Sequence, residues 1–138
     1  MQKFLTKSDE ETKNLASKIA KESKSTIFAL TGDLGAGKTT FVQGFAKGLG
    51  IKEKIISPTF VLIREHKIPN SRKVLFHIDL YRLDYEKQLK YLGLEEILSN
   101  PNNVVLIEWA EKAVKLLPKN TVWIKFKVIY GDKREILI

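Results

Sequence analysis

The segment that most constrains the fold is TGDLGAGKTT, residues 31–40, which places three glycines and one lysine within ten positions. Glycine adds no side chain to a core and loses more backbone entropy on folding than any other residue. A stretch so rich in glycine therefore suits a backbone that wraps closely around a ligand. Residues 32–39 match the pattern G-x-x-x-x-G-K-[ST] at every position. This pattern is typical of loops whose backbone N–H groups surround phosphate oxygens.

The residues on either side of the loop support the same interpretation. Thr26–Leu30 is a short apolar run typical of a buried strand, and Thr39–Leu49 carries apolar residues at helical spacing. A helix that begins directly after the loop directs the positive end of its dipole at a bound anion. We therefore expect a nucleoside triphosphate here, with Lys38 reaching its β- and γ-phosphates and Thr39 offering a hydroxyl to Mg²⁺. The chain has no N-K-x-D segment, so adenine is the expected base.

The length and composition favour one compact domain spanning residues 1–138. The chain is 43% hydrophobic, none of its apolar runs is long enough to cross a membrane, and it contains no cysteine. These features exclude disulfides and thiolate zinc sites, and they lead us to expect a cytoplasmic location. The net charge of +8 is compatible with nucleic-acid contact, but the lysines are scattered among glutamates. We therefore do not expect tight binding of tRNA by this chain alone.

The pattern along the rest of the chain predicts an α/β fold. Two strands, Phe60–Ile68 and Lys73–Ile78, are separated by Pro-Asn-Ser and should form an antiparallel hairpin. The alternation in Thr121–Ile129 places Lys125 and Lys127 on one face and Ile124, Phe126 and Val128 on the other. Other expected strands lie at Phe4–Leu5, Val104–Ile107 and Arg134–Ile138, and other helices begin after Ser8 or span Tyr85–Tyr91, Glu95–Leu98 and Ala110–Leu117. The predicted fold is a P-loop NTPase-like three-layer sandwich with a mixed, mainly parallel central sheet and an antiparallel hairpin.

Two carboxylates follow apolar runs and are candidates to hold the metal or orient water. Glu108 follows Val-Val-Leu-Ile directly, which places it at the carboxyl edge of a central strand, where open α/β sheets bind ligands. It could instead serve as a favourable charge at a helix start. Asp79 shares one face of its strand with His77 and Tyr81. The His–Asp pair could be a structural hydrogen bond, or it could sense the nucleotide or orient water. The sequence leaves open which of the two carboxylates would position a water molecule for attack on the bound phosphate.

A further candidate is the segment Ser57-Pro58-Thr59, after the helix that follows the glycine-rich loop. In nucleotide switches such a loop presents a threonine to Mg²⁺ or to the γ-phosphate. An ordinary Ser-Pro turn is the alternative.

Four segments in this order resemble the bacterial TsaE (YjeE) family: GDLGAGKTT at 32–40, SPTF at 57–60, HIDLYRL at 77–83 and IEWAEK at 107–112. Members of that family are small P-loop ATPases that support threonylcarbamoylation of the adenosine beside the anticodon in tRNAs reading codons that begin with A. The resemblance implies ATP and Mg²⁺ as cofactors and the TsaB–TsaD complex as partner. It implies a hydrolysis that is weak alone and resets that complex, which itself holds the tRNA. It implies neither DNA nor a membrane as partner.

The resemblance also assigns roles to residues. It makes Lys38, Asp79 and Glu108 catalytic, Thr39 and Glu108 metal-associated, and Trp109 a residue of core packing, of the nucleotide site or of the partner surface. The implied nucleotide-binding residues are Asp33, Leu34, Gly35, Ala36, Gly37, Lys38, Thr39, Thr40 and Arg134. The base is expected between residues 6–11 and Arg134. The implied switch-like residues are Thr59, His77, Tyr81 and Arg82.

Two other functions remain open from the sequence. One is a non-enzymatic module that binds nucleotide and joins partners, with hydrolysis incidental. The other is a phosphotransferase acting on a small molecule, although the chain has no arginine-rich segment suited to a lid.

Overall fold

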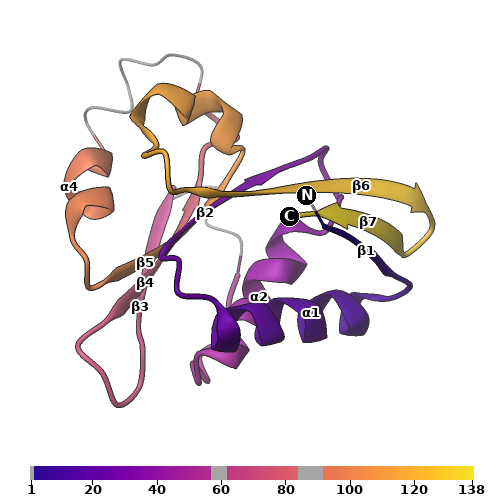
Figure 1. The fold of residues 1–138 in the computed structure, drawn as a ribbon, viewed down its shortest axis with the longest axis horizontal. Coiled ribbons are helices and arrows are strands. Elements are labelled where there is room, and N and C mark those ends of the chain that lie inside the picture. The colour runs from indigo at the N-terminus through magenta and orange to yellow at the C-terminus, as the bar shows by residue number, and fades with distance from the viewer. Residues whose placement is uncertain (1, 57–61, 84–91) are drawn as a thin grey trace.

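The computed structural model describes residues 2–56, 62–83 and 92–138, and these form a seven-stranded sheet with helices on both faces (Figure 1). The order of strands across the sheet is β1-β7-β6-β2-β5-β4-β3. The strands are β1 (Lys3–Thr6), β2 (Ile27–Thr31), β3 (Ile63–Lys67), β4 (Val74–Asp79), β5 (Asn103–Glu108), β6 (Val122–Tyr130) and β7 (Lys133–Leu137). The helices are α1 (Asp9–Glu22), α2 (Lys38–Gly48), α4 (Leu94–Ser99) and the 3₁₀ helix η1 (Ala110–Leu116).

The strand directions confirm a mixed sheet with a parallel centre. Strands β6, β2, β5 and β4 lie side by side and run parallel to one another. Strand β3 pairs antiparallel with β4, which confirms the predicted hairpin, and β7 pairs antiparallel with both β6 and β1. The carboxyl ends of the parallel strands therefore meet at one edge of the sheet. This is the edge at which the glycine-rich loop leaves β2.

Two separate hydrophobic cores give the molecule its three layers. Helices α1 and α2 cover one face of the sheet, and α4 and η1 cover the other (Figure 1). In the first core the Phe28 ring lies edge-on to Phe45, with ring centroids 5.0 Å apart, and Phe41 contacts Phe126 at 5.4 Å. The buried strand β2 serves both cores, because Phe28 and Leu30 face α2 while Ala29 faces η1. These layers confirm the predicted sandwich.

Helix α1 begins as its sequence predicts and packs very closely on α2. The Ser8 hydroxyl accepts a hydrogen bond from the Glu11 backbone N–H at 3.1 Å, and Glu11 accepts one from the Lys7 N–H at 3.1 Å. This resembles a capping box, except that Glu11 accepts from the N–H of the residue before the N-cap and not from that of Ser8 itself. At Gly44 of α2, an added Cβ would lie 2.3 Å from the Lys13 carbonyl oxygen. The contact between α1 and α2 therefore requires a residue without a side chain at this position.

Two predictions of local structure differ from the fold, and two lie wholly or partly outside its described part. The segment after β5 is not a regular α-helix. It is a 3₁₀ helix interrupted at Ala113, whose φ of −124° is not helical, and its bonds join Lys112 N–H to the Trp109 carbonyl and Leu117 N–H to the Val114 carbonyl. Val128 is 41% exposed, because β6 runs past the core there and its register with β7 shifts. The predicted helix Tyr85–Tyr91 and the first part of the predicted strand Phe60–Ile68 lie outside the described residues.

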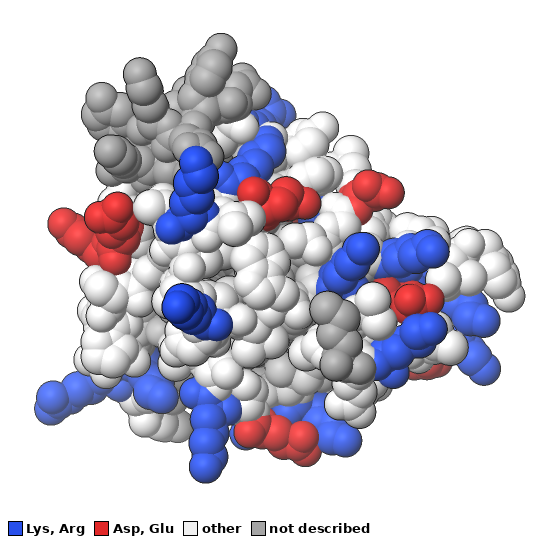
Figure 2. All heavy atoms as spheres, turned by 45° about the horizontal axis from the view of Figure 1, so that its top comes forward, with Lys and Arg blue, Asp and Glu red and all other residues white. Residues whose placement is uncertain are grey.

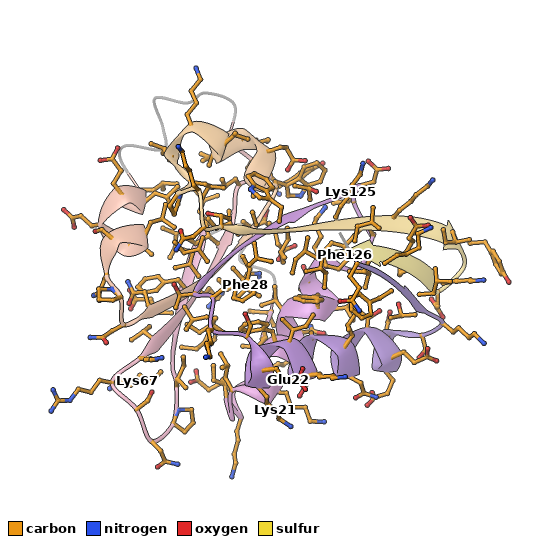
Figure 3. The ribbon with its side chains drawn as sticks, in the orientation of Figure 1. Lys21, Glu22, Phe28, Lys67, Lys125 and Phe126 are labelled. Carbon is orange, nitrogen blue, oxygen red and sulfur yellow. The ribbon has the colours of Figure 1, made fainter. Side chains whose placement is uncertain are left out.

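The outer face of β6 carries positive charge. Phe126 points into the core beneath β6, whereas Lys125 leaves the strand on the other side (Figure 3). Around the projecting end of β6 and β7, several Lys or Arg side chains gather about an acidic group (Figure 2). Lys3 Nζ of β1 lies 4.0 Å from Glu135 Oε1 of β7. Among the described helices, none is both long and apolar enough to cross a membrane.

Candidate functional site

The glycine-rich loop between β2 and α2 adopts a backbone that other residues avoid. Gly32, Gly35 and Gly37 all have positive φ, at 143°, 78° and 103°. At Gly32 an added Cβ would lie 2.6 Å from the Phe126 carbonyl oxygen, so both conformation and space require glycine. Helix α2 begins at Lys38 and its first turn has no acidic residue. Its free N–H groups and its dipole thus favour an anion at the loop.

Lys38 is enclosed by the loop and by an aromatic ring. Its ammonium donates hydrogen bonds to the carbonyl oxygens of Gly32 and Asp33, the latter at 3.1 Å. The same Nζ lies 4.0 Å from the centroid of the Trp109 ring, and the residue is only 5% exposed. Burial lowers the pKa of Lys38, an effect that the nearby carboxylates, with Glu108 the strongest, oppose. A lysine held in this way is a prepared partner for phosphate, whose charge would favour the ammonium form.

Thr39 and Glu108 join the loop to the end of the sheet. The Thr39 hydroxyl lies 2.9 Å from Glu108 Oε1 and 3.1 Å from Oε2, to which it donates. Asp79 ends β4 and is the register partner of Glu108 across the parallel pair. Its Oδ1 accepts a hydrogen bond from the Tyr81 backbone N–H at 2.9 Å, which fixes the carboxylate at the start of the following turn. Both acids are nearly buried, with exposures of 5% for Asp79 and 3% for Glu108.

The imidazole of His77 lies against Glu108. Its Nε2 is 2.5 Å from Glu108 Oε2, and the residue is fully buried. Sequence reasoning considered Asp79 as the partner of His77, because alternation places both on one face of β4. The sequence carries no signal that the neighbouring strand would bring a second carboxylate to the same face.

Aromatic and lysine side chains border the acidic end of the site. Trp109 has a positive φ of 58°, and its ring lies 5.1 Å from that of Tyr81 at an angle of 43°. Lys112 donates hydrogen bonds to the carbonyl oxygens of Tyr81, at 2.6 Å, and Leu83, at 2.9 Å. Lys112 thus fixes the chain after β4. Sequence reasoning named it within the IEWAEK segment but gave it no role, although its position four residues after Glu108 was a usable signal.

These elements enclose a pocket of about 330 Å³ at the carboxyl edge of the sheet. The pocket is lined by Asp9, Leu34, Gly35, Gly37, Lys38, Thr39, Thr40, Asp79, Tyr81, Glu108, Trp109, Asp132 and Arg134. Arg134 donates to the Gly131 carbonyl at 2.6 Å and to the Gly35 carbonyl at 3.3 Å, so it connects β7 to the loop. Asp9 lies in the expected base-binding segment, whereas Asp132 was not among the predicted site residues.

Some predicted residues do not line this pocket. Asp33 takes part through its backbone carbonyl, and the side chain of Ala36 is buried in the first core. His77 lies behind Glu108, and Arg82 is exposed beside the pocket. The roles assigned to these residues stay predictions. Thr59 lies outside the described residues.

The oxygens of Thr39, Glu108 and Asp79 have the chemistry that Mg²⁺ prefers. Magnesium binds hard oxygen ligands, and in nucleotide sites it takes one or two carboxylates together with phosphate oxygens and water. In the described ranges no three His, Asp or Glu side chains gather as a metal cluster. The hydroxyl of Thr39 and the carboxylates of Glu108 and Asp79 fit a divalent cation.

The glycine-rich loop between a buried parallel strand and a helix, with two carboxylates at the same sheet edge, defines the class of P-loop NTPase-like folds. Residues 6–136 match the family model for the threonylcarbamoyl adenosine biosynthesis protein TsaE. The chain belongs to the TsaE family.

Individual relatives agree with this assignment. The tRNA threonylcarbamoyladenosine biosynthesis protein TsaE of Bacillus subtilis is 42% identical over 97% of this chain and 82% of its own length. The protein of the same name from Rickettsia bellii is 43% identical over 92% of this chain and 87% of its own. The crystal structure of Bacillus subtilis YdiB superposes with a TM-score of 0.79 at 37% identity, covering 98% of this chain and 82% of that one.

Proposed function

We propose that this chain is a Mg²⁺-dependent ATPase of tRNA threonylcarbamoyladenosine biosynthesis. In this role it converts ATP to ADP and phosphate and thereby drives turnover of the TsaB–TsaD complex, which holds the tRNA. Membership of the TsaE family and the names of its relatives support the pathway. The composition of the pocket supports the chemistry. We propose further that the chain acts as a single domain in the cytoplasm.

The observation that carries the ATPase proposal is the contact between Thr39 and Glu108. It joins the first turn of α2 to the end of β5, where Asp79 of β4 is the register partner of Glu108. A loop that only tethered nucleotide would need no buried carboxylates at its γ-phosphate end, since removing charges from water is costly. Two carboxylates next to a phosphate loop are the groups that a hydrolase needs to hold a metal and orient water.

The geometry suggests different tasks for the two carboxylates. Glu108 is bonded to Thr39, so these two residues would hold Mg²⁺ together, and the ion would neutralise charge on the phosphates. Asp79 has one oxygen engaged by the Tyr81 N–H. We assign Asp79 to orient the water that attacks the γ-phosphorus while the bond to the β–γ bridging oxygen breaks. Lys38 and the loop N–H groups would stabilise the charge that moves onto the phosphate oxygens.

Partner activation fits a site whose rim belongs to short connecting segments. Tyr81 follows β4 directly and is 42% exposed, and Leu34 in the loop is 71% exposed. Docking of a partner on this rim could order the groups around the γ-phosphate, as occurs in other P-loop switches. We therefore expect slow hydrolysis by the chain alone.

The test is phosphate release from ATP by the purified chain with and without its cognate TsaB–TsaD complex. We expect a low rate alone, a higher rate with the complex, and no Mg²⁺-dependent hydrolysis by Lys38→Ala in either case. A rate of hydrolysis that is the same with and without the complex would contradict the proposal that TsaB–TsaD activates this chain. Full pathway function in a variant without hydrolysis would favour a nucleotide-binding module, and phosphate appearing on a small acceptor would favour a phosphotransferase.

A further inference from the structure

A buried histidine lies behind the carboxylate that we assign to the metal. His77 comes from the middle of β4, is 0% exposed and contacts Glu108 Oε2 through Nε2 at 2.5 Å. It occupies the α2 side of the sheet, where its register partner Leu106 also faces the first core. It does not line the pocket, so it is placed to act on bound nucleotide only through Glu108.

The chemistry of the pair assigns the donor in this contact. An ionised carboxylate can only accept hydrogen bonds, so we assign the hydrogen to His77 Nε2. The other ring nitrogen, Nδ1, is buried and has no hydrogen-bond partner among the described residues. A buried polar atom without a partner costs free energy that an apolar side chain would avoid. An imidazole at this position is therefore explained by what Nε2 does for Glu108 and is poorly explained by packing.

Glu108 receives two donors from different elements. His77 Nε2 approaches from β4 and the Thr39 hydroxyl approaches from α2. Together they restrict rotation of the carboxylate about its last side-chain bond. A ligand that is already oriented loses less freedom when a cation binds, which is why residues that hydrogen-bond to metal ligands affect metal affinity.

We propose that His77 is a positioning residue that holds Glu108 in the orientation needed to bind Mg²⁺ together with the nucleotide. This inference rests on the proposed function. In this role His77 does not act as a switch, and its contact with Glu108 is expected to be the same with and without nucleotide. His77 therefore affects how much Mg²⁺ increases the affinity for nucleotide. The affinity of the phosphate loop for metal-free nucleotide does not depend on His77.

The experiment compares two neutral substitutions of similar size. His77→Leu removes the donor, and His77→Gln keeps an N–H at about the distance of Nε2. Calorimetric titration measures the affinity for ATP with excess Mg²⁺ and with EDTA, and the ratio of the two gives the gain due to Mg²⁺. We expect His77→Leu to reduce this gain about tenfold, the lower range seen when such hydrogen bonds to metal ligands are removed. His77→Gln should restore most of it, and the affinity in EDTA should stay at the wild-type value for both.

Two further variants separate positioning from general damage. Leu75 lies two residues earlier on the same face of β4 and is fully buried, so Leu75→Ala lowers stability without touching Glu108. We expect Leu75→Ala to keep the wild-type gain. In the Glu108→Gln background, His77→Leu should cause no further loss of the gain in ATP affinity due to Mg²⁺, because the effects of two coupled residues do not add. If His77→Leu fails to fold, His77→Gln compared with His77→Asn, whose amide is too short to reach, provides the same contrast.

The outcomes distinguish this inference from the function on which it rests. A wild-type chain that binds ATP more tightly with Mg²⁺, together with a His77→Leu variant that shows the same gain, overturns the positioning role alone. A further loss from His77→Leu in the Glu108→Gln background overturns it as well, since His77 would then act by another route. A wild-type chain that shows no gain from Mg²⁺ contradicts the proposed function and this inference together.

Discussion

The two walls of the pocket are built in different ways. The loop wall, from Gly32 to Thr40, presents mostly backbone, and its shape depends on glycines with positive φ. The opposite wall, at the ends of β4 and β5, presents side chains: two nearly buried carboxylates, an imidazole behind one of them and an indole. The difference suggests that the loop wall supplies affinity for phosphate and the strand wall supplies chemistry. Substitutions in the two walls should therefore have separable effects on binding and turnover.

The largest separable effect is expected at Asp79. Asp79→Asn keeps the shape of the side chain and an oxygen that accepts from the Tyr81 N–H, but it removes the negative charge that would orient water. We expect the rate of ATP hydrolysis to fall about 10²- to 10⁴-fold, the usual contribution of a positioned acid or base. The affinity for Mg²⁺–ATP should change little. Measuring single-turnover hydrolysis beside calorimetric affinity checks this, and a parallel loss of both would mean that Asp79 binds the metal.

A large effect on binding is expected from the loop wall at Lys38. Lys38→Met keeps the length of the side chain but removes its charge and its hydrogen bonds. We expect ATP affinity to fall about 100-fold, because hydrogen bonds between charged groups contribute about 1.5–3 kcal/mol. The free energy of unfolding should not fall in proportion, since Lys38 is a buried charge whose pKa burial lowers. Chemical denaturation without nucleotide provides the check; a stability loss as large as the affinity loss would show that Lys38 is chiefly structural.

A smaller effect is expected where α1 meets α2, away from both walls. In Gly44→Ala the new Cβ would meet the Lys13 backbone at 2.3 Å and force the helices apart. Overpacking of this kind costs about 1–3 kcal/mol in the free energy of unfolding. Thermal unfolding measures it, with Gly93→Ala as a control, because Gly93 has a positive φ of 70° but open space around it. The backbone of Gly44 is helical and would favour alanine, so a Gly44→Ala variant as stable as the wild type would contradict the close approach of α1 and α2.

The smallest effect is expected from pH, again through Lys38. Burial lowers the pKa of Lys38 in the free protein, and bound phosphates would raise it. ATP affinity should therefore fall as the pH rises through the lowered pKa of free Lys38, with protons taken up on binding. In the same interval the unfolded chain binds more protons than the folded chain, so the unfolding free energy should rise with pH. Titrations in buffers of different ionisation enthalpy measure the uptake, and Lys38→Arg, which does not titrate, should abolish it.

Local sequence patterns predicted the loop wall well, because its determinants are consecutive residues. The glycines, Lys38 and Thr39 lie within one short segment, and the flanking strand and helix follow from apolar spacing. The strand wall depends on which strands become neighbours. Asp79 and Glu108 were recognised at strand ends, but their pairing and the contact of His77 with Glu108 arise from the register of β4 with β5. Nothing in either segment alone encodes that register.

The parts of the site contributed by β7 and by the segment after β5 were predicted least completely, because they also depend on contacts between distant parts of the chain. Asp132 and Arg134 reach the pocket because β7 turns back along β6, far along the chain from the loop. The segment after β5 has the composition of a helix, but it was not predicted to be 3₁₀. Trp109 starts it with a positive φ, and its ring packs over Lys38 and Tyr81. The spacing of apolar residues predicts neither the positive φ of Trp109 nor the contacts of its ring with Lys38 and Tyr81.

The enclosure of Lys38 has a consequence for how a nucleotide would be received. Two carbonyl oxygens and an indole ring lie against the Lys38 ammonium. Part of the dehydration that would oppose the capture of phosphate by an exposed lysine is therefore borne by folding and not by binding. On nucleotide binding, Lys38 would thus exchange neutral partners, the carbonyl oxygens and the indole, for charged phosphate oxygens. ATP would accordingly protect the fold against heat and proteases, with a gain that grows with its concentration.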